Sequence, residues 1–137
     1  MEYLRGTIVY KLLAARKKLV AAVNQDFNDV EITLENYITL HFIYENPGIT
    51  QNDLAELNSK DKNVIVKSVD KFERLGWARR ERGKEDRRSF NLYITESGKK
   101  IIGTYWKRLV KRQTDALSML SADEKESLDA LLNKILD

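Results

Sequence analysis

The chain has 137 residues, of which 42% are hydrophobic and 33% charged, and a formal net charge of +3 at pH 7. Such a length and composition are typical of a single helix-rich globular domain. The sequence contains no cysteine and one histidine, His41, which excludes disulfides, thiolate zinc sites and histidine-rich metal sites, so we expect no metal and no cofactor. No apolar run is long enough to span a membrane and the N-terminus lacks a signal-peptide layout, so we expect a cytoplasmic protein.

The residues from Glu2 to about Asp29 predict one long helix, because apolar residues recur at intervals near 3.6. This stripe consists of Leu4, Ile8, Leu12, Leu19, Val23 and Phe27. Such a helix would be about 42 Å long, whereas a compact chain of this size has a radius of gyration of about 14 Å. The helix should therefore extend beyond one subunit, and its apolar residues favour a homodimer.

Two shorter helices are predicted next. Thr33 is placed to cap a helix over Leu34–Glu45, which Pro47 and Gly48 end. Thr50 is placed to cap a second, short helix, with an acidic residue at the capping-box position three residues later.

A fourth helix follows the turn formed by residues 58–60, with Asp61 as its cap and Gly76 just beyond its end. Its apolar face consists of Ile65, Val69 and Phe72, and its opposite face of Asn63, Lys67, Asp70 and Arg74. Two short helices joined by a three-residue turn, the second of them cationic, have the order of a helix-turn-helix.

After Gly76 the apolar period changes from 3.6 to 2. Residues 77–81 and 90–94 predict two strands of a hairpin, with the polar loop Arg82–Arg87 between them. Between Ser59 and Phe90 there are eleven Lys or Arg and six Asp or Glu, a net charge of +5. A cationic helix followed by a protruding cationic hairpin favours a surface that enters DNA grooves, and an ordinary solvated face is the alternative.

Two further helices are predicted at the C-terminal end. Thr95 is placed to cap a helix that runs to about Leu117, and Ser121 and Glu124 have the spacing of a capping box for the last helix. The apolar stripe of that helix consists of Leu128, Leu131, Leu132, Ile135 and Leu136. This stripe fits either an intramolecular core or a subunit interface, and the length of the first helix favours the interface.

The segment from Leu54 to Gly98 resembles the DNA-binding core of MarR-type transcriptional regulators. The matching pieces, in order, are Leu54-Ala55, residues 69–73, residues 75–80, residues 86–89 and residues 92–98. Residues 63–66 depart from the family pattern, because they read Asn-Val-Ile-Val where Ser, Thr or Gly is frequent in the family. The base preferences of relatives are therefore not transferred to this chain.

The resemblance implies an all-α protein with a small β-hairpin wing, that is, a winged helix-turn-helix with about six helices. It implies one MarR-type domain over 1–137, a DNA-binding core over 33–97, and dimerisation helices over 1–29 and 98–137. The expected dimer interface includes Leu4, Ile8, Leu128, Leu131, Leu132 and Ile135.

The expected DNA-binding surface combines three parts. They are the helix that follows Asp61, which is the recognition helix, the hairpin of residues 77–94, which is the wing, and the start of the helix capped by Thr50. Asn63 suits a bidentate contact with adenine, and Val66 suits contact with a thymine methyl group. The wing arginines suit a phosphate or a narrow minor groove, with Asp86 expected to brace Arg88. Thr50 fits a helix cap better than a phosphate contact. The predicted contacts are Thr50, Gln51, Lys60, Lys62, Asn63, Val66, Lys67, Arg82, Lys84, Arg87 and Arg88.

A group of aromatic residues could form a ligand site. It would lie between the predicted helix over Leu34–Glu45 and the long helix that follows the wing, and the resemblance implies small, often aromatic, effectors there, as several MarR-type proteins bind them in that region. The residues are Tyr37, His41, Tyr44, Tyr105 and Trp106. Core packing is the interpretation of these side chains that we favour.

We therefore expect a sequence-specific transcriptional regulator that binds double-stranded DNA at a pseudo-palindromic operator, acting as a repressor that a small ligand releases. No catalytic constellation is present in the sequence, so we expect no enzymatic activity. The alternative is a winged-helix module for protein interaction or DNA architecture without operator specificity. A steep salt dependence of DNA binding would distinguish the two.

Overall fold

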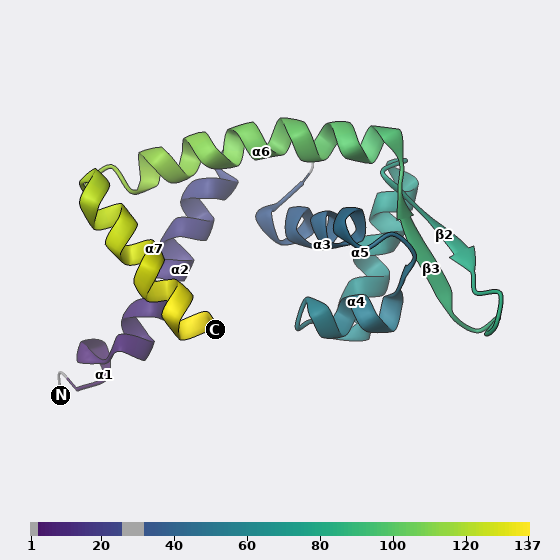
Figure 1. Ribbon diagram of the computed structural model, residues 1–137, viewed down its shortest axis with the longest axis horizontal. Coiled ribbons are helices and arrows are strands. Elements are labelled where there is room, and N and C mark those ends of the chain that lie inside the picture. Colours follow the sequence, from purple (N-terminus) through teal and green to yellow (C-terminus); the bar gives the residue numbers. More distant parts are fainter. Residues whose placement is uncertain (1–2, 26–31) are drawn as a thin grey trace. The chain divides into compact units, whose positions relative to one another are not determined.

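The computed structural model describes residues 3–25 and 32–137. In chain order the elements are α1 (Tyr3–Gly6), α2 (Ile8–Asn24), α3 (Leu34–Glu45), β1 (Ile49–Thr50), α4 (Gln51–Leu57), α5 (Lys62–Arg74), β2 (Ala78–Arg82), β3 (Phe90–Ile94), α6 (Glu96–Ala116) and α7 (Ala122–Leu136). They form two compact units, one from residues 3–25 and 108–137 and one from residues 32–107 (Figure 1). Within the described ranges, no helix is both long and apolar enough for a membrane span.

The helix starts follow the predicted caps. Thr33 Oγ1 accepts a hydrogen bond from the Asn36 amide at 3.2 Å, and Thr50 Oγ1 accepts one from the Asp53 amide at 3.1 Å. Asp61 likewise caps α5. Each side chain satisfies an amide that has no partner inside its helix, which sets where the helix begins.

The prediction of a single long helix at the N-terminus is wrong, because the helix is interrupted after Gly6. Thr7 has extended backbone angles and accepts a hydrogen bond from the Tyr10 amide at 3.2 Å, so it caps a new helix, α2. Glycine has a low helix propensity, and the threonine hydroxyl competes with the helix for hydrogen bonds to nearby backbone groups. The pair Gly6-Thr7 therefore favours a break in the helix. Helix α2 ends at Asn24, and Phe27 lies outside the described residues.

Helix α2 has 17 residues, which corresponds to only about 26 Å, so the predicted overhang no longer supports a dimer. Exposed apolar side chains support it instead. Helices α1 and α7 contain no buried residue, and Val23 is the buried residue of α2. The exposed fraction is 72% for Ile8, 58% for Leu131 and 62% for Ile135.

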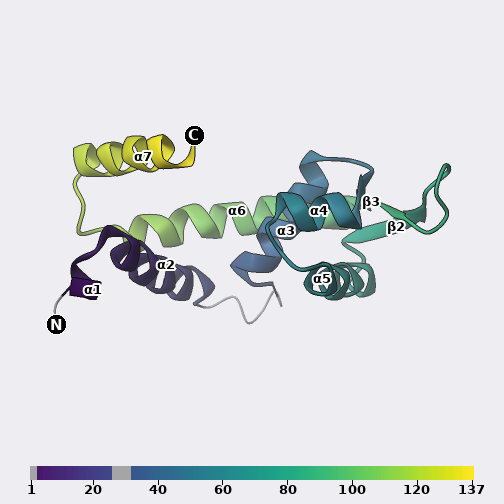
Figure 2. The same cartoon turned by 90° about the horizontal axis from the view of Figure 1, so that it is seen from below.

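The unit of residues 32–107 packs helices against a three-stranded antiparallel sheet of order β1-β3-β2. Strand β1 was not predicted, because it has two residues and exists through pairing with β3, where Ile49 lies opposite Leu92. The hairpin of β2 and β3 pairs Arg80 with Leu92 and Arg82 with Phe90. Its tip projects past α4 and α5 in both views (Figures 1 and 2). Strand β2 begins one residue later than predicted.

The core of this unit contains the apolar face predicted for α5. Its fully buried apolar side chains include Ile32, Leu40, Ile43, Leu54, Ile65, Val69, Phe72 and Leu92. Removing this surface from water is the main force that holds α5 in place. Gly76, at a φ of +76°, reverses the chain after α5, a conformation that only glycine adopts without strain. Gly76, which was predicted to end the helix, therefore also sets the direction in which the hairpin leaves α5.

Candidate nucleic-acid interface

Helix α5 presents the predicted recognition residues to solvent. Lys62, Asn63, Val66 and Lys67 are all exposed, on the first turns of the helix, while Ile65 between them is buried. Burial of one face determines which side chains remain available on the other. The helix therefore offers cationic, amide and apolar groups together, which are the groups that distinguish base edges in a major groove.

The turn that leads into α5 is held against α3. Asn58 Nδ2 donates to Thr39 Oγ1 at 2.6 Å, and the Thr39 side chain is buried. Lys60 Nζ lies 2.9 Å from a carboxylate oxygen of Glu35. Lys60 was predicted to contact DNA, but its charge already has a partner inside the protein. It is therefore a weaker candidate than Lys62 or Lys67.

Backbone hydrogen bonds shape the wing. Asp86 Oδ1 accepts from the Arg88 amide at 2.9 Å, and the Ser89 hydroxyl donates to the Asp86 carbonyl at 2.9 Å. Arg82 Nη1 donates to the Arg87 carbonyl at 3.0 Å. The Asp86 carboxylate was expected to brace the side chain of Arg88, and it forms a long ion pair with Arg88 Nε at 3.9 Å that leaves this side chain 98% exposed. Asp86 thus orders the loop and leaves the guanidinium accessible.

Side chains at the start of α4 line a shallow hollow together with the wing. Thr50, Gln51 and Asn52 form one side, and the wing contributes Asp86 and Arg88 among others. Thr50 acts as a cap, and Gln51 Oε1 accepts a hydrogen bond from Arg80 Nε at 2.7 Å. The structure therefore brings the predicted residues of α4 next to the wing, although both already have partners in the protein.

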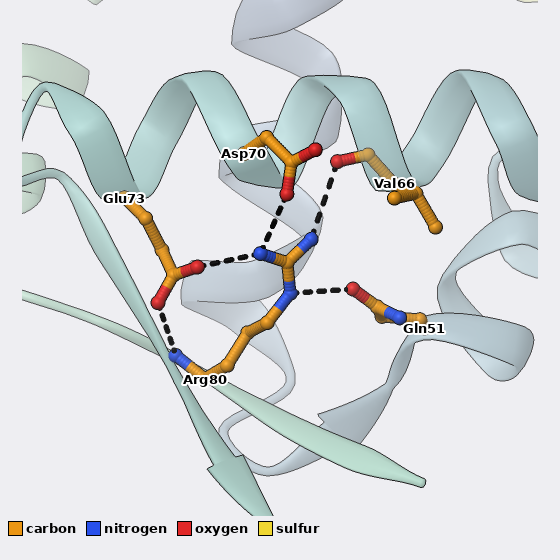
Figure 3. A network of polar contacts seen from close by, with 5 residues as sticks. All are labelled: Gln51, Val66, Asp70, Glu73 and Arg80. Atoms are coloured by element: carbon orange, nitrogen blue, oxygen red, sulfur yellow. Dashed lines mark hydrogen bonds and ion pairs between the residues drawn. The ribbon is translucent and has the colours of Figure 1, made fainter.

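Arg80 was not among the predicted site residues, yet it lies at the centre of this region (Figure 3). Its side chain is 14% exposed and contacts Asp70 and Glu73 of α5 at 2.7 and 2.5 Å. The sequence contained a signal for this role. Arg80 lies two residues after the apolar Ala78, so strand alternation places both on one face, and the structure buries Ala78 on that face, where a charge needs partners.

The aromatic residues predicted to bind a ligand occupy different environments. The rings of Tyr37 and Tyr105 stack at a centroid distance of 4.3 Å and both are buried, so Tyr105 packs in the core. Burial raises the pKa of Tyr105 to about 12 and raises the pKa of Tyr37 as well. The Tyr37 hydroxyl is buried without a hydrogen bond to a described residue.

A shallow apolar groove lies beside this stack. Six residues line it: Tyr37, Ile38, His41, Phe42, Glu45 and Trp106. His41 Nδ1 lies 2.9 Å from Glu45 Oε1, which orients the imidazole. Tyr44 does not line the groove and is 45% exposed. Three of the five predicted residues thus lie on the groove itself. In the described part of the chain, no three His, Cys, Asp or Glu side chains gather as metal ligands.

Comparisons with known proteins agree on one family. Residues 31–89 match the model of the MarR family. The chain is 32% identical over 112 residues to the uncharacterized HTH-type transcriptional regulator YybA of Bacillus subtilis (strain 168), covering 82% of this chain and 75% of that protein. Its fold is similar to that of the transcriptional repressor CouR bound to a 23-mer DNA duplex, with a TM-score of 0.86 and 25% identity over 98% of this chain and 95% of that one. The wild-type apo form of MarR from E. coli superposes with a TM-score of 0.87 at 22% identity, covering 96% and 97% of the two chains.

Proposed function

The chain belongs to the MarR family of transcriptional regulators, and we propose that it binds a pseudo-palindromic operator as a homodimer and represses transcription there. The observation that carries this proposal is the joint exposure of α5 and the wing. Lys67 and Asn63 on the helix and Arg87 and Arg88 on the hairpin are all solvent-accessible, while the helix is anchored by a buried face. A rigid scaffold with accessible cationic groups is what groove recognition requires.

On α5, we assign the base-reading role to Lys62, Asn63, Val66 and Lys67. Asn63 pairs bidentately with adenine and Val66 contacts a thymine methyl group, since these groups match the edges that those bases present in the major groove. One good bidentate contact discriminates against the wrong base by about 1–3 kcal/mol. Lys60, paired with Glu35, contributes mainly to holding the turn.

On the wing, Arg82, Lys84, Arg87 and Arg88 contact phosphates or the adjacent minor groove. The ordered loop backbone supports this role, because the hairpin projects past the helices (Figure 2) and its cationic side chains are exposed. Thr50 and Gln51 contribute at the edge of the same surface. Such contacts set the orientation of the protein on DNA and do not by themselves read the sequence.

The exposed apolar residues of α1, α2 and α7 support a homodimer. Leu4, Ile8, Leu131 and Ile135 are each more than half exposed, and an apolar surface of this kind is typical of a protein interface. Leu128 and Leu132 extend the same set on α7. Two-fold symmetry would place the half-sites about one helical turn, 34–36 Å, apart.

A small ligand that enters the groove beside Tyr37 would release the operator. The groove walls are apolar and aromatic, with one imidazole and one carboxylate, which suits a small aromatic molecule. Such a ligand acts only through a difference in its affinity for the DNA-bound and free forms. A thermal-shift screen of small phenols and aromatic acids tests this part, and no rise in melting temperature with any of them would count against it.

The decisive experiment is selection of bound duplexes from random DNA at about 150 mM salt, close to physiological ionic strength. We expect a two-fold symmetric motif whose half-sites are about ten base pairs apart. Recovery of no motif, with only weak and salt-sensitive binding, would instead support an architectural or protein-binding winged helix.

A further inference from the structure

Arg80 occupies a position where a cation is costly. It lies in the middle of β2, opposite Leu92 of β3, on the face of the hairpin that packs against the helices. A charged side chain with 14% exposure has lost most of its hydrogen bonds to water, and hydrogen bonds to protein acceptors must replace them. The contacts that Arg80 makes therefore explain why the residue is there.

The guanidinium contacts acceptors from two helices (Figure 3). Nε donates to Gln51 Oε1 of α4 at 2.7 Å, and Nη2 donates to the main-chain carbonyl of Val66 at 3.2 Å. Nη1 contacts both Asp70 Oδ1 and Glu73 Oε1. In addition, the Arg80 amide donates to the other Glu73 oxygen at 3.4 Å. All three nitrogens of the guanidinium are thus committed to protein acceptors.

The acceptors on α5 form one stripe of the recognition helix. Val66, Asp70 and Glu73 follow each other at intervals of four and three residues, so they lie on one side of the helix. That stripe adjoins Asn63 and Lys67, the groups proposed to read bases. The Arg80 side chain thus binds the recognition helix α5 beside its base-reading residues, while the Arg80 backbone is part of β2, the first strand of the wing.

We propose that Arg80 is a positioning residue for operator recognition, which joins α5, the start of α4 and wing strand β2 into one rigid body and makes no contact with DNA itself. This inference rests on the proposed function. Arginine is required because its planar fork reaches acceptors in several directions at once, whereas a lysine ammonium is a single point.

The expected consequence is a loss of specificity more than a loss of binding. Attraction between cations and phosphates tolerates small changes in orientation, whereas hydrogen bonds to base edges do not. Without Arg80, the recognition helix and the wing can still each approach DNA. They no longer do so in a fixed relation, so contacts with the correct bases are lost first.

The test compares Arg80→Met and Arg80→Lys with the matched control Arg79→Met. Arg79 is the neighbouring cation on the other face of the same strand, where it is 54% exposed and pairs with Glu81. Dissociation constants are measured for the selected operator and for a scrambled duplex, over a range of salt concentrations. The wild type must first show a selected operator; without one, the proposed function fails and the role of Arg80 is not in question.

We expect Arg80→Met to lower the ratio of operator to scrambled affinity at least tenfold, with Arg79→Met close to wild type. Arg80→Lys should lose most of the ratio although it keeps the charge. A folded Arg80→Met with an unchanged ratio would overturn the proposal. Equal losses on both duplexes, with a salt slope lower by about 0.9, would also overturn it, because Arg80 would then contact a phosphate.

Two further variants separate positioning from neutralisation and from misfolding. Arg80→Met combined with Asp70→Asn and Glu73→Gln removes the carboxylates that lose their partner. If this triple variant recovers the wild-type ratio, Arg80 acts only by neutralising charge, and the proposal is wrong. If circular dichroism shows that Arg80→Met is unfolded, Glu73→Gln, which weakens one link, should still lower the ratio measurably. An unchanged ratio there would overturn the proposal.

Discussion

Replacing Arg87 and Arg88 of the wing with alanine should weaken operator binding without affecting the fold. Both side chains are exposed, and Arg88 is 98% exposed. The hydrogen bonds that shape the loop use the Arg88 amide and the Arg87 carbonyl, which alanine retains. The substitution therefore removes two cations and leaves the backbone contacts in place.

The size of the effect follows from counterion release. Each neutralised phosphate contributes about 0.9 to the slope of log affinity against log salt, so two contacts contribute about 1.8. A fourfold increase in salt, from about 50 to 200 mM, should therefore cost the wild type about twelvefold more affinity than the variant. At about 150 mM salt we expect at least a tenfold loss, which corresponds to about 1.4 kcal/mol.

Fluorescence anisotropy with the selected operator measures both quantities. The matched control is Lys100→Ala with Lys107→Ala, two exposed cations on α6 outside the predicted contacts. Both double variants lower the formal net charge from +3 to +1, so a general charge effect would appear in both. Only the wing variant should change the salt slope.

Two outcomes would refute the reasoning. Unchanged affinity with an unchanged circular dichroism spectrum would mean that the wing does not contact DNA. A loss of affinity with an unchanged salt slope would mean that Arg87 and Arg88 act through something other than phosphate contact.

Three predictions concern stability. Asn58→Ala should lower the free energy of unfolding by about 1 kcal/mol in urea titrations, since it removes the hydrogen bond to buried Thr39. Hydrogen bonds from Ser121 lower the pKa of Glu124 from its unfolded value of 4.5. The carboxylate therefore stabilises α7 above pH 4.5, and this contribution to stability is lost as the pH falls below that value. Glu124→Gln should flatten that part of the pH profile of the melting temperature. The pKa of Tyr105 is raised from 10.0 to about 12, so stability present below pH 10 should fall between about pH 10 and 12; Tyr105→Phe should reduce that fall, and an equal fall in both proteins would contradict the assignment.

Several elements could be predicted from the sequence because local interactions decide them. The bounds of α3 follow from Thr33 and the Pro47-Gly48 pair, and the start of α7 follows from the Ser121 capping box. The hairpin follows from the change of apolar period after Gly76. Each of these signals involves residues within a few positions of one another, so no knowledge of the tertiary structure is required. The break at Thr7 was also local, and the apolar stripe obscured it.

The tertiary structure decided which polar side chains are committed to the protein. Strand β1 exists only because β3 lies beside it. Lys60 is paired because Glu35, 25 positions earlier in the chain, lies near the turn. Arg80 bonds to Gln51, 29 positions away, and to Val66, 14 positions away. Strand alternation can place Arg80 on the inward face, but its partners are determined by how the helices pack on the sheet. Sequence patterns thus determine where an element begins and which face it buries. Folding brings distant charged groups within hydrogen-bonding distance, and it therefore decides which cations pair inside the protein and which remain accessible to DNA.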